Sequence, residues 1–104
     1  MNNEEGDKVI IRVDADLEEL MPTYLENRRK DIESILAALA TADYPAIETL
    51  GHRMKGSGGG YGLDGISEIG REIELSAKDK NGDRIRKAVV ALANYLDRIK
   101  IVYG

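Results

Sequence analysis

Apolar residues recur at helical spacing in four separate stretches of this chain, and this repetition limits the fold more than any other feature. The stretches are 22–41, 43–60, 64–80 and 83–102. Their apolar positions, counting the residue just before the first and the third stretch, are Met21, Leu25, Ile32, Ile35, Leu36 and Leu39; Ile47, Leu50 and Met54; Leu63, Ile66, Ile69, Ile73 and Ala77; and Ile85, Ala88, Val89, Leu92, Leu96 and Ile99. Spacings of three and four residues place each set on one helix face. Four such helices joined by short turns predict an all-α, antiparallel four-helix bundle.

Capping residues predict where these helices begin. Asp16, followed three residues later by Glu19, indicates a short extra N-terminal helix. Pro22 separates that helix from the first long one, because proline has no amide hydrogen to donate. Asp43 and Asp64 are expected to cap the second and third long helices.

The sequence Asn81-Gly82-Asp83 predicts the turn between the last two helices. We expect Gly82 in the left-handed conformation, which glycine adopts without steric cost, and Asp83 as the cap of the fourth helix. That helix is expected to run to Val102.

The chain divides into a flexible or extended N-terminal segment, residues 1–14, and one helical domain, residues 15–104. Residues 1–8 are polar and expected to be disordered, whereas the β-branched run Val9–Val13 suits an extended segment packed against the domain. Arg28 falls on the apolar face of the first long helix. We expect its stem to follow that face while its guanidinium reaches solvent, or the residue to border an open end of the bundle.

Composition excludes several classes of function. The chain has 104 residues, enough for one domain, and it has no cysteine for a disulfide, a thiol nucleophile or a thiolate metal site. Its single histidine, His52, excludes any metal site with two histidine ligands, and we expect no metal ion. A net charge of −4 without a basic stripe argues against nucleic-acid binding. Without a signal peptide or an apolar segment of ~20 residues, we expect a cytoplasmic protein.

Seven of the eleven glycines lie within residues 51–65, together with the only histidine. On a helical wheel, Ile47, Leu50 and Met54 face the core. His52 lies about 160° from Met54 on the same wheel, so its imidazole is expected to point to solvent.

The helical neighbours of His52 suit a reaction with a group that another protein delivers. Glu48 lies one turn before it, Lys55 and Gly56 one turn after it, and Gly59 two turns after it. Neutral imidazole is a nitrogen nucleophile, and the Lys55 ammonium would neutralise a phosphoryl group on the ring, which Glu48 would mildly oppose. A glycine inside a helix costs ~1 kcal/mol relative to alanine. That cost at Gly56 favours a close approach to the backbone over an incidental surface histidine.

Two nucleotide-binding patterns match only by chance. Residues 60–65 read G-x-G-x-x-G, but they follow a helix rather than a strand, and Lys55-Gly56-Ser57 reverses the order of a P-loop. No ATP site is therefore expected.

The run His52-Arg53-Met54-Lys55-Gly56-Ser57, followed by Tyr61-Gly62-Leu63, resembles the signature of histidine-containing phosphotransfer (HPt) domains of two-component phosphorelays. That signature reads H-x-(apolar)-K-G-[SA], with a later apolar–Gly pair whose glycine is Gly62 here. The resemblance extends over residues 15–102. The run Gly58-Gly59-Gly60 stands where the family more often has Ala or Ser, which implies a more flexible helix at that point.

The resemblance implies that His52 accepts a phosphoryl group, that Lys55 stabilises it, and that Glu48, Gly56 and Gly59 belong to the docking surface. It implies a monomeric phosphocarrier rather than an enzyme, with no cofactor of its own. Its partners would be response-regulator receiver domains, which hold the magnesium ion, or a hybrid histidine kinase. Two alternatives remain: a non-catalytic helical adaptor in which His52 is incidental, and a phosphohistidine carrier outside two-component signalling.

Overall fold

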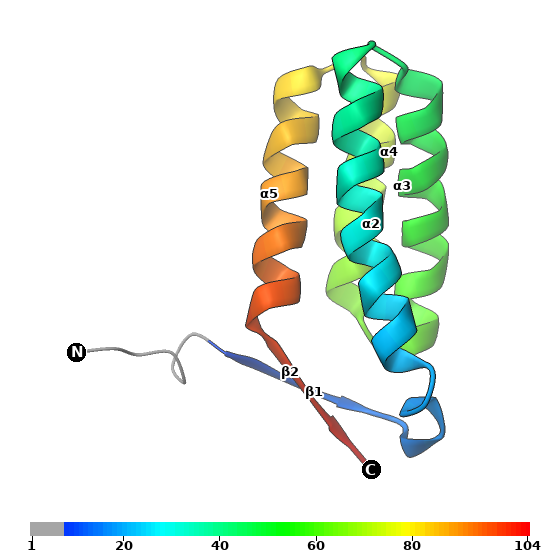
Figure 1. The fold of residues 1–104 in the computed structure, drawn as a ribbon, viewed down its shortest axis with the longest axis vertical. Helices are drawn as coiled ribbons and strands as arrows, with labels where there is room; N and C mark the ends of the chain where they lie inside the picture. The colour runs from blue at the N-terminus through cyan, green and yellow to red at the C-terminus, as the bar shows by residue number, and fades with distance from the viewer. Residues whose placement is uncertain (1–7) are drawn as a thin grey trace, which may run out of the picture.

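Four long helices account for most of the chain in the computed structural model, which describes residues 8–104. The elements in order are β1 (Val9–Val13), the 3₁₀ turn η1 (Ala15–Leu17), α2 (Met21–Ala40), α3 (Tyr44–Gly58), the 3₁₀ turn η2 (Gly59–Tyr61), α4 (Asp64–Lys78), α5 (Gly82–Arg98) and β2 (Ile99–Tyr103). Figure 1 shows the chain rising through α2, returning through α3, rising again through α4 and returning through α5. The four helices lie in the stretches where the apolar periodicity predicts them, although the last one ends earlier than predicted.

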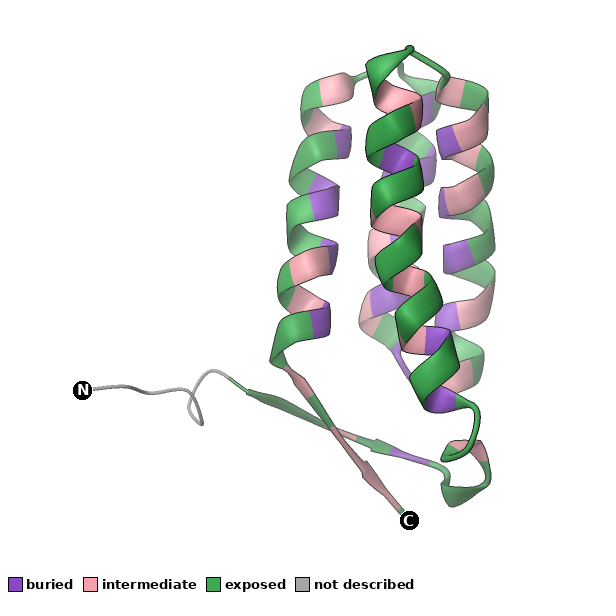
Figure 2. Cartoon of the chain, viewed as in Figure 1, coloured by how far each residue is buried: buried purple, intermediate pink, exposed green. Residues whose placement is uncertain are grey.

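The core consists of the apolar stripes that these helices turn toward one another. Figure 2 shows the buried positions on the inward faces of all four helices. Ile35, Ile47 and Leu92 have no exposed surface. Leu36 was expected in the stripe of α2, and this prediction is wrong: Leu36 is 46% exposed. It lies about 100° around the helix from Ile35 and turns outward, while Tyr24 is buried on the inward face.

The expected extended segment is confirmed as β1, which pairs in parallel with β2, Val9 beside Ile99 and Val13 beside Tyr103. The prediction that the last helix runs to Val102 is wrong, because α5 ends at Arg98. The backbone of Ile99 is already extended, with φ −72° and ψ 141°. Pairing with β1 satisfies backbone groups that a helix would otherwise satisfy, and it packs apolar side chains of β2 against the core.

The N-terminal region differs from its predicted form. The short extra helix is only the single 3₁₀ turn η1, and Asp14 rather than Asp16 caps it by accepting from the Asp16 amide at 2.8 Å. The expected disorder of residues 1–7 lies outside the described residues. Lys8 is described, and its Nζ donates to the carbonyl of Asp97 at 3.3 Å.

Two of the predicted helix caps are also wrong. Asp64 is the first residue of α4 rather than its cap, which is Leu63. Asn81 caps α5 in place of Asp83, because its side chain accepts from the Arg84 amide at 3.1 Å. By contrast, Asp43 caps α3 as predicted, accepting from the Ala46 amide.

The turn between α4 and α5 places its left-handed residue at Lys80, with φ 52°, and not at Gly82. Two hydrogen bonds close the end of α4: Lys80 donates to the Ala77 carbonyl at 3.0 Å and Asn81 to the Ser76 carbonyl at 2.9 Å. This pattern is typical of a helix end that requires one left-handed residue directly after the last turn. Gly82 comes two residues later and is already helical.

Candidate functional site

His52 lies in the middle of α3, and its side chain is 67% exposed, as predicted. Ile47 and Met54 on the same helix are buried in the core. The imidazole therefore stands on the outer surface of the bundle, within reach of another protein.

The buried carboxylate of Glu74, on α4, holds His52 and Lys55 at once. Its Oε2 lies 2.9 Å from His52 Nδ1 and its Oε1 lies 2.7 Å from Lys55 Nζ. The side chain of Glu74 is only 9% exposed. The hydrogen bond from Lys55, and secondarily that from His52, keeps the pKa of the Glu74 carboxyl below its ordinary value.

This contact decides which ring nitrogen is available for chemistry. An ionised carboxylate can only accept hydrogen bonds, so Nδ1 of His52 carries the proton that it donates to Glu74. The neutral ring then has its lone pair on Nε2. The nitrogen with the free lone pair is thus Nε2, on a side chain that is exposed.

Sequence reasoning missed Glu74, because the residue lies 22 positions from His52 on a different helix. One signal was present. Glu74 falls between Ile73 and Ala77, within the apolar stripe of the third predicted helix. A carboxylate on a buried helix face is rare unless it has a partner, so its position indicates a buried ion pair or hydrogen bond.

The residues predicted to surround His52 lie along α3 and, for Gly59, at the start of η2. Lys55, 41% exposed, lies one turn beyond it and Glu48 one turn before it. Glu48 has a cation beside it, since its Oε2 lies 4.0 Å from Lys78 Nζ. A Cβ added at Gly56 would meet no heavy atom within 4 Å, and one added at Gly59 would make only ordinary contacts. The surface beside the imidazole is open.

The glycine-rich end of α3 has a more definite structure than its sequence implies. The helix gives way at Gly58 to the 3₁₀ turn η2, and Gly62 follows in the left-handed conformation with φ 76°. The hydroxyl of Ser67, on α4, accepts from the Gly59 amide at 2.8 Å and donates to the Lys55 carbonyl at 2.9 Å. These two bonds fix the end of the helix where the glycines would otherwise loosen it.

Arg28 has a structural place on α2. Its guanidinium lies 4.4 Å above the ring of Tyr24 and bonds the Asp31 carboxylate at 2.7 Å. Tyr24 in turn stacks on Tyr61 at 3.9 Å and shares a hydrogen bond with Ser57. The guanidinium therefore packs on the stacked pair of Tyr24 and Tyr61, which joins α2 to the end of α3.

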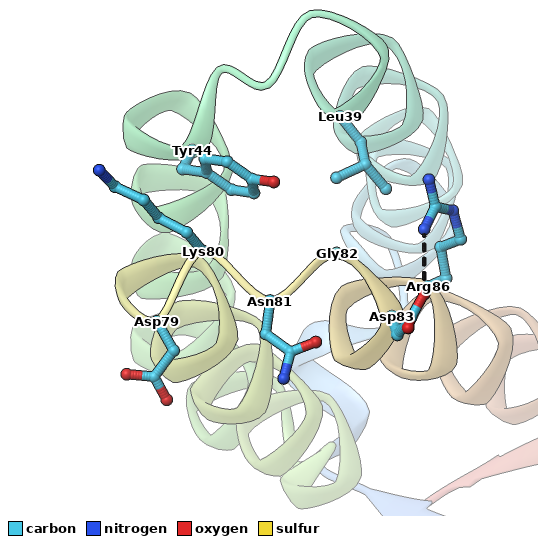
Figure 3. Close-up of a pocket in the computed structure, with 8 residues that line it drawn as sticks. All are labelled: Leu39, Tyr44, Asp79, Lys80, Asn81, Gly82, Asp83 and Arg86. Carbon is cyan, nitrogen blue, oxygen red and sulfur yellow. Dashed lines mark hydrogen bonds and ion pairs between the residues drawn. The ribbon is translucent and has the colours of Figure 1, made fainter.

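A hollow of about 470 Å³ lies between the α2–α3 and α4–α5 turns. Figure 3 shows Tyr44 and Lys80 on one side of it and Arg86 paired with Asp83 on the other. Neither His52 nor Lys55 lines this hollow. This hollow is therefore separate from the candidate site, where the side chains of His52 and Lys55 are exposed.

A comparison with protein families finds that residues 19–101 match the model of the Hpt domain. The chain belongs to the HPt family. No curated protein and no solved structure matches it. HPt domains are phosphocarriers that take part in histidine phosphotransfer in two-component phosphorelays. Within residues 8–104, none of the helices combines the length and the apolar character that a membrane crossing requires.

Proposed function

We propose that this HPt domain accepts a phosphoryl group on Nε2 of His52 and exchanges it with the aspartate of a receiver domain. The observation that carries the proposal is the arrangement of His52, Lys55 and Glu74. An exposed imidazole is held by a buried carboxylate through one nitrogen, which leaves the other nitrogen nucleophilic.

In the transfer, the Nε2 lone pair attacks the phosphorus of an aspartyl phosphate. The new N–P bond forms as the P–O bond to the carboxyl breaks, and the aspartate leaves as a carboxylate. The ring keeps its proton on Nδ1 and so becomes cationic. Glu74, an anion 2.9 Å away, stabilises that positive charge as it develops. The reverse sequence returns the phosphoryl group to a receiver.

Lys55 contributes charge next to the phosphoryl group. Its ammonium has three donors, of which Glu74 Oε1 takes one. Lys55 lies one helical turn from His52, so its remaining donors are available to the oxygens of a phosphoryl group on the His52 ring. Phosphoryl transfer depends mainly on such positioning and charge stabilisation, and this small set of residues is sufficient for a carrier.

The partners in this proposal are response-regulator receiver domains and, as an upstream donor, a hybrid histidine kinase. The domain acts in the cytoplasm as a monomer, without ATP and without a cofactor of its own. The magnesium ion needed for the aspartate chemistry is held by the receiver. Glu48, Gly56 and Gly59 form the part of the docking surface next to His52.

The test is to incubate the chain with receivers loaded by acetyl phosphate or by a kinase, in a screen of receivers from the source organism. We expect an acid-labile phosphate on the wild-type chain and none on His52→Gln. The substitution should leave the helical circular dichroism unchanged, because the side chain is exposed and glutamine suits a helix.

An undiminished acid-labile signal on His52→Gln would refute the assignment of the phosphoacceptor. Absence of label from every receiver would favour the helical adaptor. Loading by a phosphodonor protein that is not a receiver, with no loading by receivers, would identify a carrier outside two-component signalling.

A further inference from the structure

We propose that Gly51 and Gly70 are positioning residues for phosphotransfer, because they allow α3 and α4 to approach closely enough for Glu74 to hold His52 and Lys55 together. This inference rests on the proposed function for its effect on transfer. Its geometric part, that the two glycines allow the contact between Glu74 and His52, concerns the folded chain alone.

Each of the two glycines abuts the backbone of a residue in the ion pair. A Cβ added at Gly51 would lie 2.6 Å from the backbone nitrogen of Glu74, and one added at Gly70 would lie 2.5 Å from that of Lys55. The two positions also face each other, since each Cβ would lie 2.8 Å from the carbonyl oxygen of the other glycine. The close approach of the two helices therefore includes the backbone of both Lys55 and Glu74, whose side chains meet at 2.7 Å.

The atoms in the way belong to the backbone, so a methyl group could be accommodated only by moving the helices apart. Ordinary contact distances to carbon begin near 3.5 Å, so the required separation is on the order of 1 Å. A separation of that size would stretch the bond of 2.9 Å between His52 and Glu74 beyond the range of hydrogen bonds. Lys55 has a long flexible side chain that can follow, so the His52 contact is the first to be lost.

The neighbouring Gly58 provides a matched control. A Cβ there would lie 2.6 Å from the backbone nitrogen of Ser67, so its substitution forces the same two helices apart with equal severity. Gly58 lies six residues beyond His52, about 9 Å along the axis, next to the turn. A merely structural role for the glycines would make Gly58→Ala and Gly70→Ala behave alike.

The experiment compares Gly70→Ala, Gly51→Ala and Gly58→Ala in buffer with sucrose, which favours the folded state. Nitrogen NMR of the His52 ring reports which nitrogen carries the proton, and single-turnover transfer from one loaded receiver reports function. In the wild type and in Gly58→Ala, we expect the proton on Nδ1. In Gly70→Ala and Gly51→Ala, we expect it to redistribute to Nε2 and transfer to slow by about ten- to a hundredfold, since a displacement near 1 Å can cost that much.

Three results would overturn the proposal: equal ring spectra in Gly58→Ala and Gly70→Ala, a shifted proton with unchanged transfer, or loss of folding in both Gly51→Ala and Gly70→Ala while Gly58→Ala folds. The last result would show that the two glycines serve stability alone. If the wild type accepts no phosphoryl group, the proposed function fails. The ring spectra would then still decide the geometric part.

Discussion

Gly56 is the position at which stability and function should respond in opposite directions. A side chain there would find open space, because no heavy atom lies within 4 Å of an added Cβ. Replacing a helical glycine with alanine stabilises by up to ~1 kcal/mol, which for a domain of this size raises the melting temperature by about 4–8 °C. Glutamine is a slightly weaker helix former, so we expect Gly56→Gln to recover about half of that gain.

The same glutamine should obstruct transfer. Residues one helical turn apart have Cβ atoms about 5–6 Å from each other, so a long side chain at Gly56 can extend over the His52 ring. A receiver aspartate must bring its phosphorus within about 3–3.5 Å of Nε2, and we expect transfer to slow by at least about tenfold. Gly56→Ala, with its short side chain, should slow it much less.

The assay pairs thermal melts with single-turnover transfer from one loaded receiver. Gly60→Gln is the control, because Gly60 also has no heavy atom within 4 Å of an added Cβ and lies two turns beyond His52. It should leave transfer within about twofold of the wild type. If Gly56→Gln melts earlier than the wild type, the glycine is required for backbone geometry; if it melts later and transfers normally, Gly56 does not border the docking path.

Further predictions concern charge and packing. In single-turnover labelling, Lys55→Ala should slow transfer severalfold without abolishing it, and Lys55→Arg should largely preserve it. Complete loss of transfer in Lys55→Ala would reveal a role of Lys55 beyond its charge. The hydrogen bond from Arg84 lowers the pKa of the Glu72 carboxyl below its ordinary value of 4.5. The stability that this ion pair contributes is therefore fully present above pH 4.5 and is lost as the pH falls through the lowered pKa. Urea titrations should therefore find Glu72→Gln less stable than the wild type at neutral pH, with a gap that closes in strong acid. Leu92→Ala leaves a cavity at a fully buried position and should lower the free energy of unfolding, measured by urea titration, by about 2–5 kcal/mol. The ring spectrum of His52 should stay unchanged, which would show that the effect is confined to the core.

The helices were predictable because each of them buries one stripe, and a stripe is a local property of the sequence. The end of α5 was not predictable in this way. Ile99, Ile101 and Tyr103 continue an apolar pattern that also suits a strand. Their backbone conformation depends on β1, which comes from the other end of the chain.

The candidate site likewise has features that the sequence predicts and features that depend on tertiary packing. The exposure of His52 and the proximity of Lys55 follow from spacing along a single helix, so both could be predicted. The partner that orients the imidazole could not, because Glu74 reaches it from another helix through tertiary packing. The glycines show the same limit. Their abundance was evident from the sequence, but only the packing distinguishes the open Gly56 from Gly58, which lies against α4.

The parallel pairing of β1 with β2 also determines how this domain bears tension. Val9 stands beside Ile99 and Val13 beside Tyr103, so the chain enters the strand pair at one end and leaves it at the other. A pull on these two points acts along the strands and loads all the hydrogen bonds between them together, in shear, instead of opening them one by one. While those bonds hold, the force passes from β1 directly into β2. The helices that carry His52 and Glu74 are then shielded from the load.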